Sequence, residues 1–359
     1  MNSELQTLID KITPADPGVI KRANIRQARL TKPPGSLGRL EEISVRLAGV
    51  FGTTRPAVAS RSLVIAAGDH GVVAQGITAY PQDITGQMVL NFLAGGAAVT
   101  AMTRSLGVDV TVVDAGVKSS LPAHPDLISL RIGPGTNDIS EGPAMSREDA
   151  ERCVLEGSRI GADAAGDGSG LVATGDMGIG NTTPSSAITA AITGMPPEVT
   201  TGRGTGRNAN ELRLKIEVVS RALDVNQPDR ADPIDVLAKV GGFEIGVLAG
   251  VMLGAASRGN AVVIDGFISG AAALIATGLA PALGDHLFAG HRSAEAGHSI
   301  VLDHLGLEPI LDLDMRLGEG TGAVLAMSII DAAAACLAEM ATFDEAGVSD
   351  AEPEKTRTK

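Results

Sequence analysis

The sequence predicts an α/β protein with a parallel sheet of about six strands, and two observations carry this prediction. Short apolar runs recur along the chain, and most end at a glycine or an aspartate that is followed by a stretch with helical periodicity. Hydrophobic residues make up 44% of the 359 residues but aromatic residues only 2%, so small aliphatic side chains must fill the core. Such side chains suit closely packed layers of helices on a sheet.

The first fifty residues are predicted to be helical. Apolar residues recur at helical spacing in two stretches, at positions 5, 8, 9 and 12 and at positions 40, 43 and 47. Pro17 suits the first turn of a further helix between them. Residues 1–50 are therefore expected to form the N-terminal part of a small helical domain.

Six runs are predicted to be strands, joined by right-handed crossovers. They lie at 62–67, 109–113, 170–174, 261–264, 286–289 and 309–313. We expect the sheet and its helices to form a large domain over residues 51–321, and an apolar helix to complete the small domain over 322–345. Residues 346–359 are charged and lack apolar anchors, which predicts a disordered tail. The irregular segment 195–210 predicts a mobile loop at the active site.

The charge of the chain argues against nucleic acid as a partner. The formal net charge is −13 and the isoelectric point is near 4.9, so the protein repels phosphate backbones. The scarcity of aromatic residues also removes the stacking platforms of single-strand binders. An anionic substrate must therefore be held by local backbone N–H groups and a few cations.

Neither the N-terminus nor the apolar runs predict export or membrane insertion. The first residues lack the basic region and apolar stretch of a signal peptide, and the runs at 271–283 and 322–337 are expected to fall short of the roughly 20 residues of a span. The two cysteines, Cys153 and Cys336, show neither a disulfide framework nor metal-binding spacing. We expect a cytoplasmic protein that makes no membrane contact.

Five glycine-rich turns are candidates for a binding site at the carboxyl ends of the strands. They are GDHG at 68–71, GDMGIGN at 175–181, DGFISG at 265–270, GHRS at 290–293 and GEGTG at 318–322. Glycine lets the backbone approach a ligand closely, and such turns form anion-binding nests. Each turn taken alone is equally well a tight connection between a strand and a helix, but five together favour one shared site.

The turn at 175–181 is the predicted phosphate site, because it leads into a helix start at Thr182. Gly178, Gly180 and Asn181 belong to this turn. The segment TGRGTGR at 201–207, with Gly202 and Gly204, and the later Lys215 can add N–H groups and a cation. A solvated flexible loop is the alternative interpretation of 201–207.

Glu319 is the candidate general base, because it lies between two glycines directly before the last long helix. Burial beside apolar neighbours raises the pKa of a carboxyl towards neutrality, which suits proton abstraction. Capping of the helix by Glu319 is the alternative.

The histidines do not predict a metal site. His291, Glu295 and His298 would share a helix face, but no further ligand completes a set. His291 and Ser293 fit better as groups that face a substrate from the start of a helix. The sequence thus predicts no metal and no other cofactor.

The chain is similar to the nicotinate-nucleotide–dimethylbenzimidazole phosphoribosyltransferases, which make the lower-ligand nucleotide of cobalamin. The resemblance covers almost the whole chain in six motifs. They are KPPGSLGRLEE at 32–42, AGDHGVVAQGITAYPQDITGQMV at 67–89, GDMGIGNTT at 175–183, DGFISGAAAL at 265–274, GHRSAEAGH at 290–298 and LDLDMRLGEGTGA at 311–323.

The resemblance implies a fold and a set of site residues. The fold is a Rossmann-like sheet of six parallel strands with a small helical domain from both chain ends, in a homodimer. Glu319 matches the general base of the family, and the phosphate would lie at 175–183, 202–206 and Lys215. Asp265 and Ser293 would lie near the ribose and nicotinate. The benzimidazole pocket would be lined by Tyr80, Gln87, Met88 and Leu317.

One position departs from the family pattern. Asp176 stands where the family commonly carries glutamate, which is one methylene longer. We expect Asp176 to assist the base or to stabilise the positive charge that develops on the ribose.

The resemblance implies transfer of the phosphoribosyl group of nicotinate mononucleotide to a benzimidazole base. Two other functions are compatible with the same crevice. A phosphoribosyltransferase with a pyrophosphate donor predicts paired acids before a Thr-Gly loop, whereas this chain has Asp265 alone. A non-catalytic nucleotide sensor predicts binding without turnover and leaves Glu319 unexplained.

Overall fold

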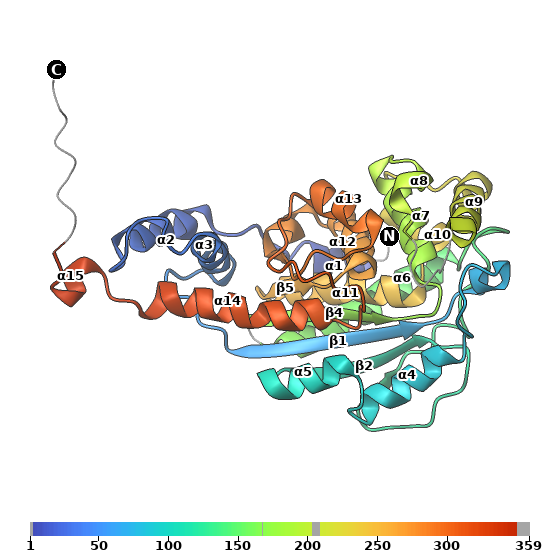
Figure 1. The fold of residues 1–359 in the computed structure, drawn as a ribbon, viewed down its shortest axis with the longest axis horizontal. Coiled ribbons are helices and arrows are strands. Elements are labelled where there is room, and N and C mark those ends of the chain that lie inside the picture. The colour runs from blue at the N-terminus through green and yellow to red at the C-terminus, as the bar shows by residue number, and fades with distance from the viewer. Residues whose placement is uncertain (1–2, 167, 203–208, 350–359) are drawn as a thin grey trace, which may run out of the picture. The chain divides into compact units, whose positions relative to one another are not determined.

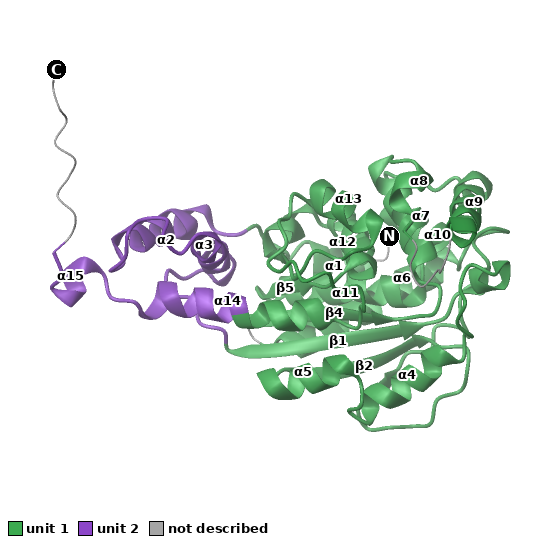
Figure 2. Ribbon diagram, viewed as in Figure 1, with its two compact units in different colours: residues 1–14, 59–328 green, residues 15–58, 329–359 purple. Residues whose placement is uncertain are grey.

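The computed structural model describes residues 3–166, 168–202 and 209–349, which form two compact units (Figure 2). Unit 1 comprises residues 1–14 and 59–328, and unit 2 comprises residues 15–58 and 329–359. The divisions therefore fall at other positions than the expected ones after residues 50 and 321. The first residues group with unit 1 because helix α1 (Ser3–Ile9) buries Leu5 in the core of that unit.

Unit 1 is built on a sheet of six parallel strands in the order β3-β2-β1-β4-β5-β6, which is the Rossmann order (Figure 1). The strands are β1 (Ser60–Gly68), β2 (Asp109–Gly116), β3 (Leu127–Ser129), β4 (Gly170–Met177), β5 (Ala261–Ile264) and β6 (Leu287–Ala289). β1 and β4 pair along their lengths at the centre and are almost continuously buried, as in sheets covered on both faces. The predicted fold class is confirmed.

One predicted strand is wrong and one strand escaped prediction. The run at 309–313 forms only an isolated bridge between Leu311 and His291, because Pro309 has no N–H and Asp312 directly follows Leu311. The sixth strand is instead β3, an edge strand of three residues that pairs with the end of β2. Three half-exposed residues are too few to show an alternating pattern.

Helices cover the sheet on both sides. Those of unit 1 are α1, α4 (Ile84–Leu93), α5 (Ala98–Leu106), α6 (Arg147–Ala165), α7 (Thr182–Thr193), α8 (Pro197–Thr200), α9 (Ala209–Asn226), α10 (Pro233–Val240), α11 (Phe243–Ser257), α12 (Phe267–Leu279), α13 (Ala296–Leu305) and the start of α14 (Thr321–Glu339). α4 and α5 contact β1 and β2, whereas α6 and α11 contact β1 and β4 from the other side (Figure 1).

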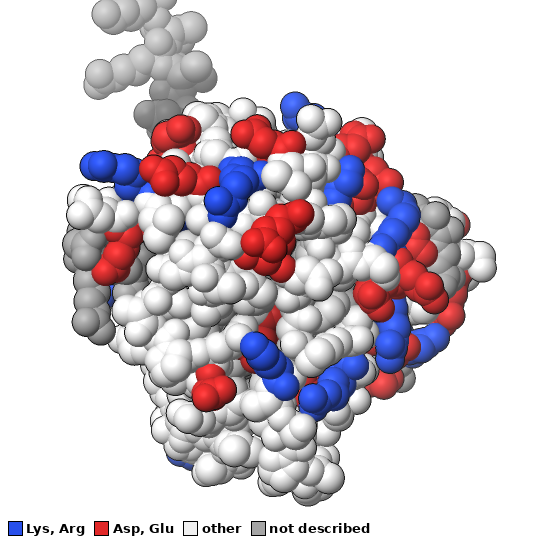
Figure 3. Space-filling view, turned by 90° about the vertical axis from the view of Figure 1, so that its right-hand side faces the viewer, with Lys and Arg blue, Asp and Glu red and all other residues white. Residues whose placement is uncertain are grey.

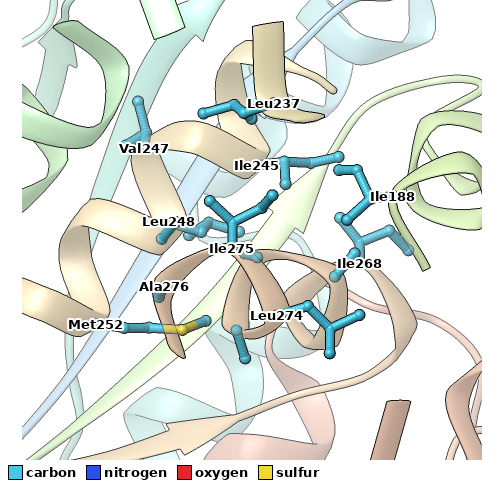
Figure 4. Close-up of a cluster of buried hydrophobic side chains, with 14 of the residues drawn as sticks. Ile188, Leu237, Ile245, Val247, Leu248, Met252, Ile268, Leu274, Ile275 and Ala276 are labelled. Carbon is cyan, nitrogen blue, oxygen red and sulfur yellow. The ribbon is translucent and has the colours of Figure 1, made fainter. Parts of the chain in front are cut away.

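The core between these helices consists of aliphatic side chains. Figure 4 shows Leu237 of α10, Leu248 and Met252 of α11 and Ile275 of α12 packed together, and each is fully buried. α11 is apolar on every side because it lies between the sheet and other helices.

Glycines allow α6 and α11 to touch through their backbones. A Cβ at Gly157 or Gly161 of α6 would collide with the carbonyl oxygen of Val247 or Val251 of α11. Gly250 and Gly254 of α11 meet α6 in the same way, at the carbonyl oxygens of Val154 and Ser158. This contact explains how a chain with few large side chains reaches dense packing.

Unit 2 joins helices from both ends of the chain. It contains α2 (Pro17–Arg29), α3 (Arg39–Phe51), the second part of α14 and α15 (Phe343–Ala346). Val19 of α2, Val45 of α3 and Leu337 of α14 share its buried core. Arg26 also donates hydrogen bonds to the carbonyls of Leu337 and Met340 at 2.9 and 2.8 Å, which satisfies the C-terminus of α14. The expected tail begins inside α15, and residues 350–359 lie outside the described residues.

Two apolar segments among the described residues, Ile84–Leu106 and Thr321–Glu339, are long enough to cross a membrane by length and composition. The expectation that the C-terminal run is too short is therefore wrong. The first segment is two helices separated at residues 94–97, and 56% of the second window is buried inside the protein. Core helices of globular proteins show the same features, so neither segment argues for a membrane span.

The contact between α6 and α11 can be tested by adding one methyl group. Gly250→Ala should lower the free energy of unfolding by about 1–2 kcal/mol, because overpacking against backbone atoms outweighs the gain in helix propensity. Denaturant unfolding measures the change. Gly142→Ala is the matched control, because nothing lies within 4 Å of its added methyl group, and it should change stability by less than about 0.5 kcal/mol. Equal stability of both variants would contradict the backbone contact.

Candidate active site

A cavity of about 850 Å³ lies in unit 1 at the carboxyl ends of the central strands. Its lining comes from residues 77–88, 176–182, 266–268, 291–296 and 316–319, together with Gly202 and Lys215. The sheet order reverses between β1 and β4, and ligands of open α/β sheets bind at such a switch point. Four of the five predicted turns thus meet in one cavity, whereas the turn at 68–71 does not line it.

Most of the predicted site residues line this cavity. They are Tyr80, Met88, Asp176, Gly178, Gly180, Asn181, Thr182, Gly202, Lys215, Ser293, Leu317 and Glu319. Gly204 lies outside the described residues. The predicted loop 195–210 also contains helix α8 and the start of α9, so it is less irregular than its composition indicates.

Lys215 and the start of α7 form one end of the site. Nζ of Lys215 donates to Oγ1 of Thr182, the first residue of α7, at 2.5 Å. Burial lowers the pKa of Lys215 to about 8, against the opposing effect of Glu295. A buried cation at a helix N-terminus is suited to an anion.

Glu319 sits on a strained turn at another part of the cavity. Its φ of 62° is unfavourable for a residue with a side chain, and the glycines on both sides also have positive φ. The turn can pack on β4 only because residue 175 is glycine, since a Cβ there would collide with the carbonyl of Glu319. Glu319 is 6% exposed, and burial raises the pKa of its carboxyl while a hydrogen bond from the Val99 backbone opposes this rise. The structure therefore places a raised-pKa carboxylate in the cavity.

Asp176 lies at the end of β4, beside the turn that carries Glu319. Its carboxyl accepts a hydrogen bond from Nδ2 of Asn181 at 2.8 Å, and both oxygens lie 3.5 Å from a Cβ built on Gly318. Burial, with a further contribution from Asp265, raises the pKa of Asp176 to about 8. At neutral pH Asp176 is therefore mainly uncharged in the free protein.

Two predicted residues lie outside the cavity lining. Asp265 is fully buried, and its carboxylate accepts hydrogen bonds from the backbone N–H groups of Gly320, Gly322 and Ala323 at 2.7–3.2 Å. It caps the start of α14 instead of facing the cavity. Gln87 is exposed on α4, one position away from Met88, whose side chain does line the cavity.

The predicted helical arrangement of the histidines is wrong. α13 begins at Ala296, so His291 and Glu295 lie before it, and of these three residues His298 alone is in the helix. Among residues 3–166, 168–202 and 209–349, no group of three or more His, Cys, Asp or Glu is placed to hold a metal ion.

The sequence did not single out several lining residues. Ile77 and Ile84 form an apolar wall with Met88. Their residue types look like ordinary core positions. The only signal was their place inside the longer motif at 67–89. Phe267 and Ile268, which open α12 at the cavity, belong to the predicted turn at 265–270.

The outer surface at this end of the sheet carries both signs of charge. Figure 3 shows acidic and basic side chains interspersed among uncharged ones. An anion that reaches the cavity is therefore held by local groups such as Lys215 and not by a broad positive surface.

Comparison with known proteins identifies the family. A sequence model of a phosphoribosyltransferase family matches residues 12–348. The nicotinate-nucleotide–dimethylbenzimidazole phosphoribosyltransferase of Chloroflexus aggregans is 56% identical over 348 residues, which are 97% of this chain and 99% of the relative. The chain belongs to this family.

Other members of the family agree with this assignment. The enzyme of the same name from Desulforudis audaxviator is 52% identical, over 97% of this chain and 98% of the relative. The crystal structure of the Thermus thermophilus enzyme matches with a TM-score of 0.89 at 49% identity, over 94% of this chain and 100% of that chain. The resemblance found in the six motifs is confirmed.

The raised pKa of Asp176 predicts a stability that depends on pH. The folded state holds the proton more tightly than the unfolded state, so this contribution is complete below pH 3.8 and is lost as pH rises towards 8. Asp176→Asn stays uncharged, so at pH 8 it should be more stable than the native protein, by at most about 5 kcal/mol. Denaturant unfolding at pH 4 and pH 8 measures this. Asp163→Asn, at an exposed position of α6, should show no gain in stability at pH 8. If the free energy of unfolding changes by the same amount between pH 4 and pH 8 in all three proteins, the raised pKa of Asp176 is refuted.

Proposed function

We propose that this chain transfers the phosphoribosyl group of nicotinate mononucleotide to 5,6-dimethylbenzimidazole. The products are nicotinate and α-ribazole 5′-phosphate, which is used for the nucleotide loop of cobalamin. The observation that carries the proposal is Glu319, a buried carboxylate on a strained turn in a cavity that also holds the cationic Lys215. The relatives with this enzyme name align over nearly the full chain.

The end of the cavity at Lys215 suits the phosphate of the donor. Thr182 begins α7, where the positive end of the helix dipole favours an anion, and the ammonium group of Lys215 is 2.5 Å from the Thr182 hydroxyl. Gly180 and Gly202 let the backbone approach the phosphate closely. A phosphate at this point would hold Lys215 in its charged form, because an anion raises the pKa of a neighbouring amine.

An apolar wall suits the acceptor base. Tyr80, Ile84, Met88 and Leu317 line the cavity, and the exposed fractions of Tyr80 and Leu317 are 45% and 57%, so a flat aromatic ring can cover them. The acceptor attacks C1′ of the ribose through one ring nitrogen while Glu319 removes the proton from the other. This removal prevents positive charge from accumulating on the benzimidazole.

The two carboxyl groups have different roles because their environments differ. Asp176 is mainly protonated at neutral pH, because burial and the neighbouring Asp265 raise its pKa to about 8, whereas Glu319 accepts a hydrogen bond from the Val99 backbone, which favours the carboxylate. Glu319 is therefore the base, and Asp176 orients the site as an uncharged donor next to it. The leaving pyridine nitrogen becomes neutral when its bond to C1′ breaks, so this step needs no general acid.

An assay with nicotinate mononucleotide and 5,6-dimethylbenzimidazole in the presence of a chelator tests the proposal. Chromatography should show nicotinate and the α-configured nucleotide in equal amounts. Activity only with a pyrophosphate donor and Mg²⁺ would contradict it in favour of the other phosphoribosyltransferase class. Tight nucleotide binding without turnover would favour a sensor.

Glu319→Gln tests the identity of the base. The variant should bind the donor normally but lose at least about 100-fold in kcat, since general base catalysis contributes about 10²–10⁴-fold. Steady-state kinetics and donor titration measure the two effects separately. Glu148→Gln, at an exposed position of α6, is the control and should retain full activity. A Glu319→Gln variant with native kcat would exclude Glu319 as the base.

The assembly and location also belong to the proposal. We expect a cytoplasmic homodimer, because the family resemblance implies a dimer and the substrates are soluble metabolites. Tyr80 and Leu317 are exposed apolar residues at the cavity, and their exposure supports a contact with a second subunit there. Sedimentation equilibrium should give twice the chain mass of 36.4 kDa, and a monomer at micromolar concentration would contradict the dimer.

A further inference from the structure

Thr85 carries a buried hydroxyl group beside the cavity to which the proposed chemistry gives no role. It lies on α4 between Ile84 and Met88, which form part of the apolar wall of the cavity, and its own exposed fraction is 0%. Oγ1 of Thr85 accepts a hydrogen bond from the backbone N–H of Ile179 at 3.1 Å. Ile179 belongs to the turn from β4 to α7 and also lines the cavity. One hydroxyl group therefore joins the apolar wall to the glycine-rich turn.

The carboxylate of Asp69 anchors this hydroxyl group to the sheet. Asp69 directly follows β1 and is 1% exposed. Its Oδ2 accepts a hydrogen bond from the backbone N–H of Lys118, which lies after β2, at 2.8 Å. Burial raises the pKa of Asp69, and hydrogen bonds from Lys118 and from the Thr85 side chain oppose this rise. A hydroxyl group can donate and accept at once, so Thr85 donates to Asp69 while it accepts from Ile179.

This link crosses the crevice at the switch point of the sheet. α4 contacts β1 and β2 from one side, whereas α7 packs on α12, which lies with α11 on the other side (Figure 1). β1 and β4 pair along their lengths, but the connections that follow them lead to opposite faces. The apolar wall and the turn at 175–181 thus belong to different layers, and the bond between Thr85 and Ile179 fixes the distance between them.

We propose that Thr85 is a positioning residue that couples the binding of the acceptor base to the binding of the donor phosphate. The inference rests on the proposed function for the identity of these two ligands. A base that packs on Ile84 and Met88 holds α4 in place, and through Thr85 it also holds the turn at 175–181. The phosphate then meets a turn that is already ordered, so its binding is stronger. Each ligand should therefore strengthen the binding of the other.

The same link aligns the two reacting atoms. Attack on C1′ requires the acceptor nitrogen to lie about 3–3.5 Å from this carbon, and a displacement of about 1 Å can cost on the order of 100-fold in rate. The acceptor packs on α4, whereas the turn at 175–181 holds the donor. The relative position of the two atoms therefore depends on the contact between Thr85 and Ile179.

Calorimetry of two ligands, each alone and both together, tests the inference. The probes are 5,6-dimethylbenzimidazole and ribose 5-phosphate, which lacks the pyridine leaving group and does not turn over. In the native protein, saturating ribose 5-phosphate should tighten the binding of 5,6-dimethylbenzimidazole at least about fivefold, the lower end of typical couplings between sites. Thr85→Val keeps the shape of the side chain but removes the hydroxyl group, so this factor should fall to within about twofold.

Two further variants separate positioning from a general loss of packing. Thr85→Ser restores the hydroxyl group and should recover the native coupling factor. Thr103→Val is the matched control, because the Thr103 hydroxyl group is also buried, on α5, and donates to the carbonyl of Thr100 at 3.1 Å. This variant loses a buried hydrogen bond away from the cavity lining and should keep the native factor. Thr85→Ala removes the same hydroxyl group and replaces Thr85→Val if that variant does not fold.

Three results would overturn the inference. The first is the absence of coupling in the native protein, which needs no variant. The second is native coupling in Thr85→Val, as expected when the two ligands act on each other by direct contact. The third is an equal loss of coupling in Thr85→Val and Thr103→Val, as expected of a structural role.

Failure of the inference and failure of the proposed function give different results. Turnover of nicotinate mononucleotide without coupling contradicts the inference alone. Coupling without turnover contradicts the proposed function alone. A native protein that binds neither probe contradicts both.

Discussion

The buried carboxylate of Asp265 is the group on which the geometry of the turn that carries Glu319 depends. It follows β5 directly and accepts three backbone hydrogen bonds from the turn and first residues of α14. Burial raises the pKa of Asp265, and His291 and these N–H groups oppose that rise. Because Glu319 immediately precedes Gly320, the same bonds hold Glu319 in its left-handed conformation. One carboxylate thereby connects the sheet, Glu319 and His291.

A second buried pair, His70 and Glu244, supports the turn at 175–181 that leads to α7. Nε2 of His70 lies 2.9 Å from Oε1 of Glu244, and both side chains are fully buried. A Cβ built on Gly178 would lie 3.2 Å from Nε2 of His70, so the pair packs against the turn that leads to α7. The turn at 68–71, which is absent from the cavity lining, therefore supports the site from behind. Glu244 also contributes to the raised pKa of Asp176.

Patterns that span many residues predicted the fold well. Gly68 and Asp265 marked the true ends of β1 and β5, whereas β4 continues past Gly175 to Met177. Pro17 marked the start of α2, where Asp16 is the N-cap. The short edge strand β3 was missed, and 309–313 was predicted as a strand although it forms only a bridge, because pairing depends on neighbours distant in sequence.

The site was predictable where backbone conformation limits the residue type. Glycine-rich turns located Glu319, Asp176 and the residues around Asn181. Asp265 could not be assigned in this way, because a strand-end aspartate can face a ligand or cap a neighbouring helix, and only the three-dimensional position of α14 distinguishes the two. Gln87 and Met88 are adjacent in sequence, but one helical step turns them to different sides.

The pKa values of Lys215 and Asp176 are both near 8, so the net charge of the cavity changes with pH around this value. As pH rises from 7 to 9 the lysine loses most of its positive charge and the aspartate gains most of a negative one, so the cavity becomes more negative. An anion that enters at the upper end of this range favours the protonated form of both groups. Its binding is then accompanied by proton uptake from solution, and by thermodynamic linkage a proton becomes a co-ligand of the substrate.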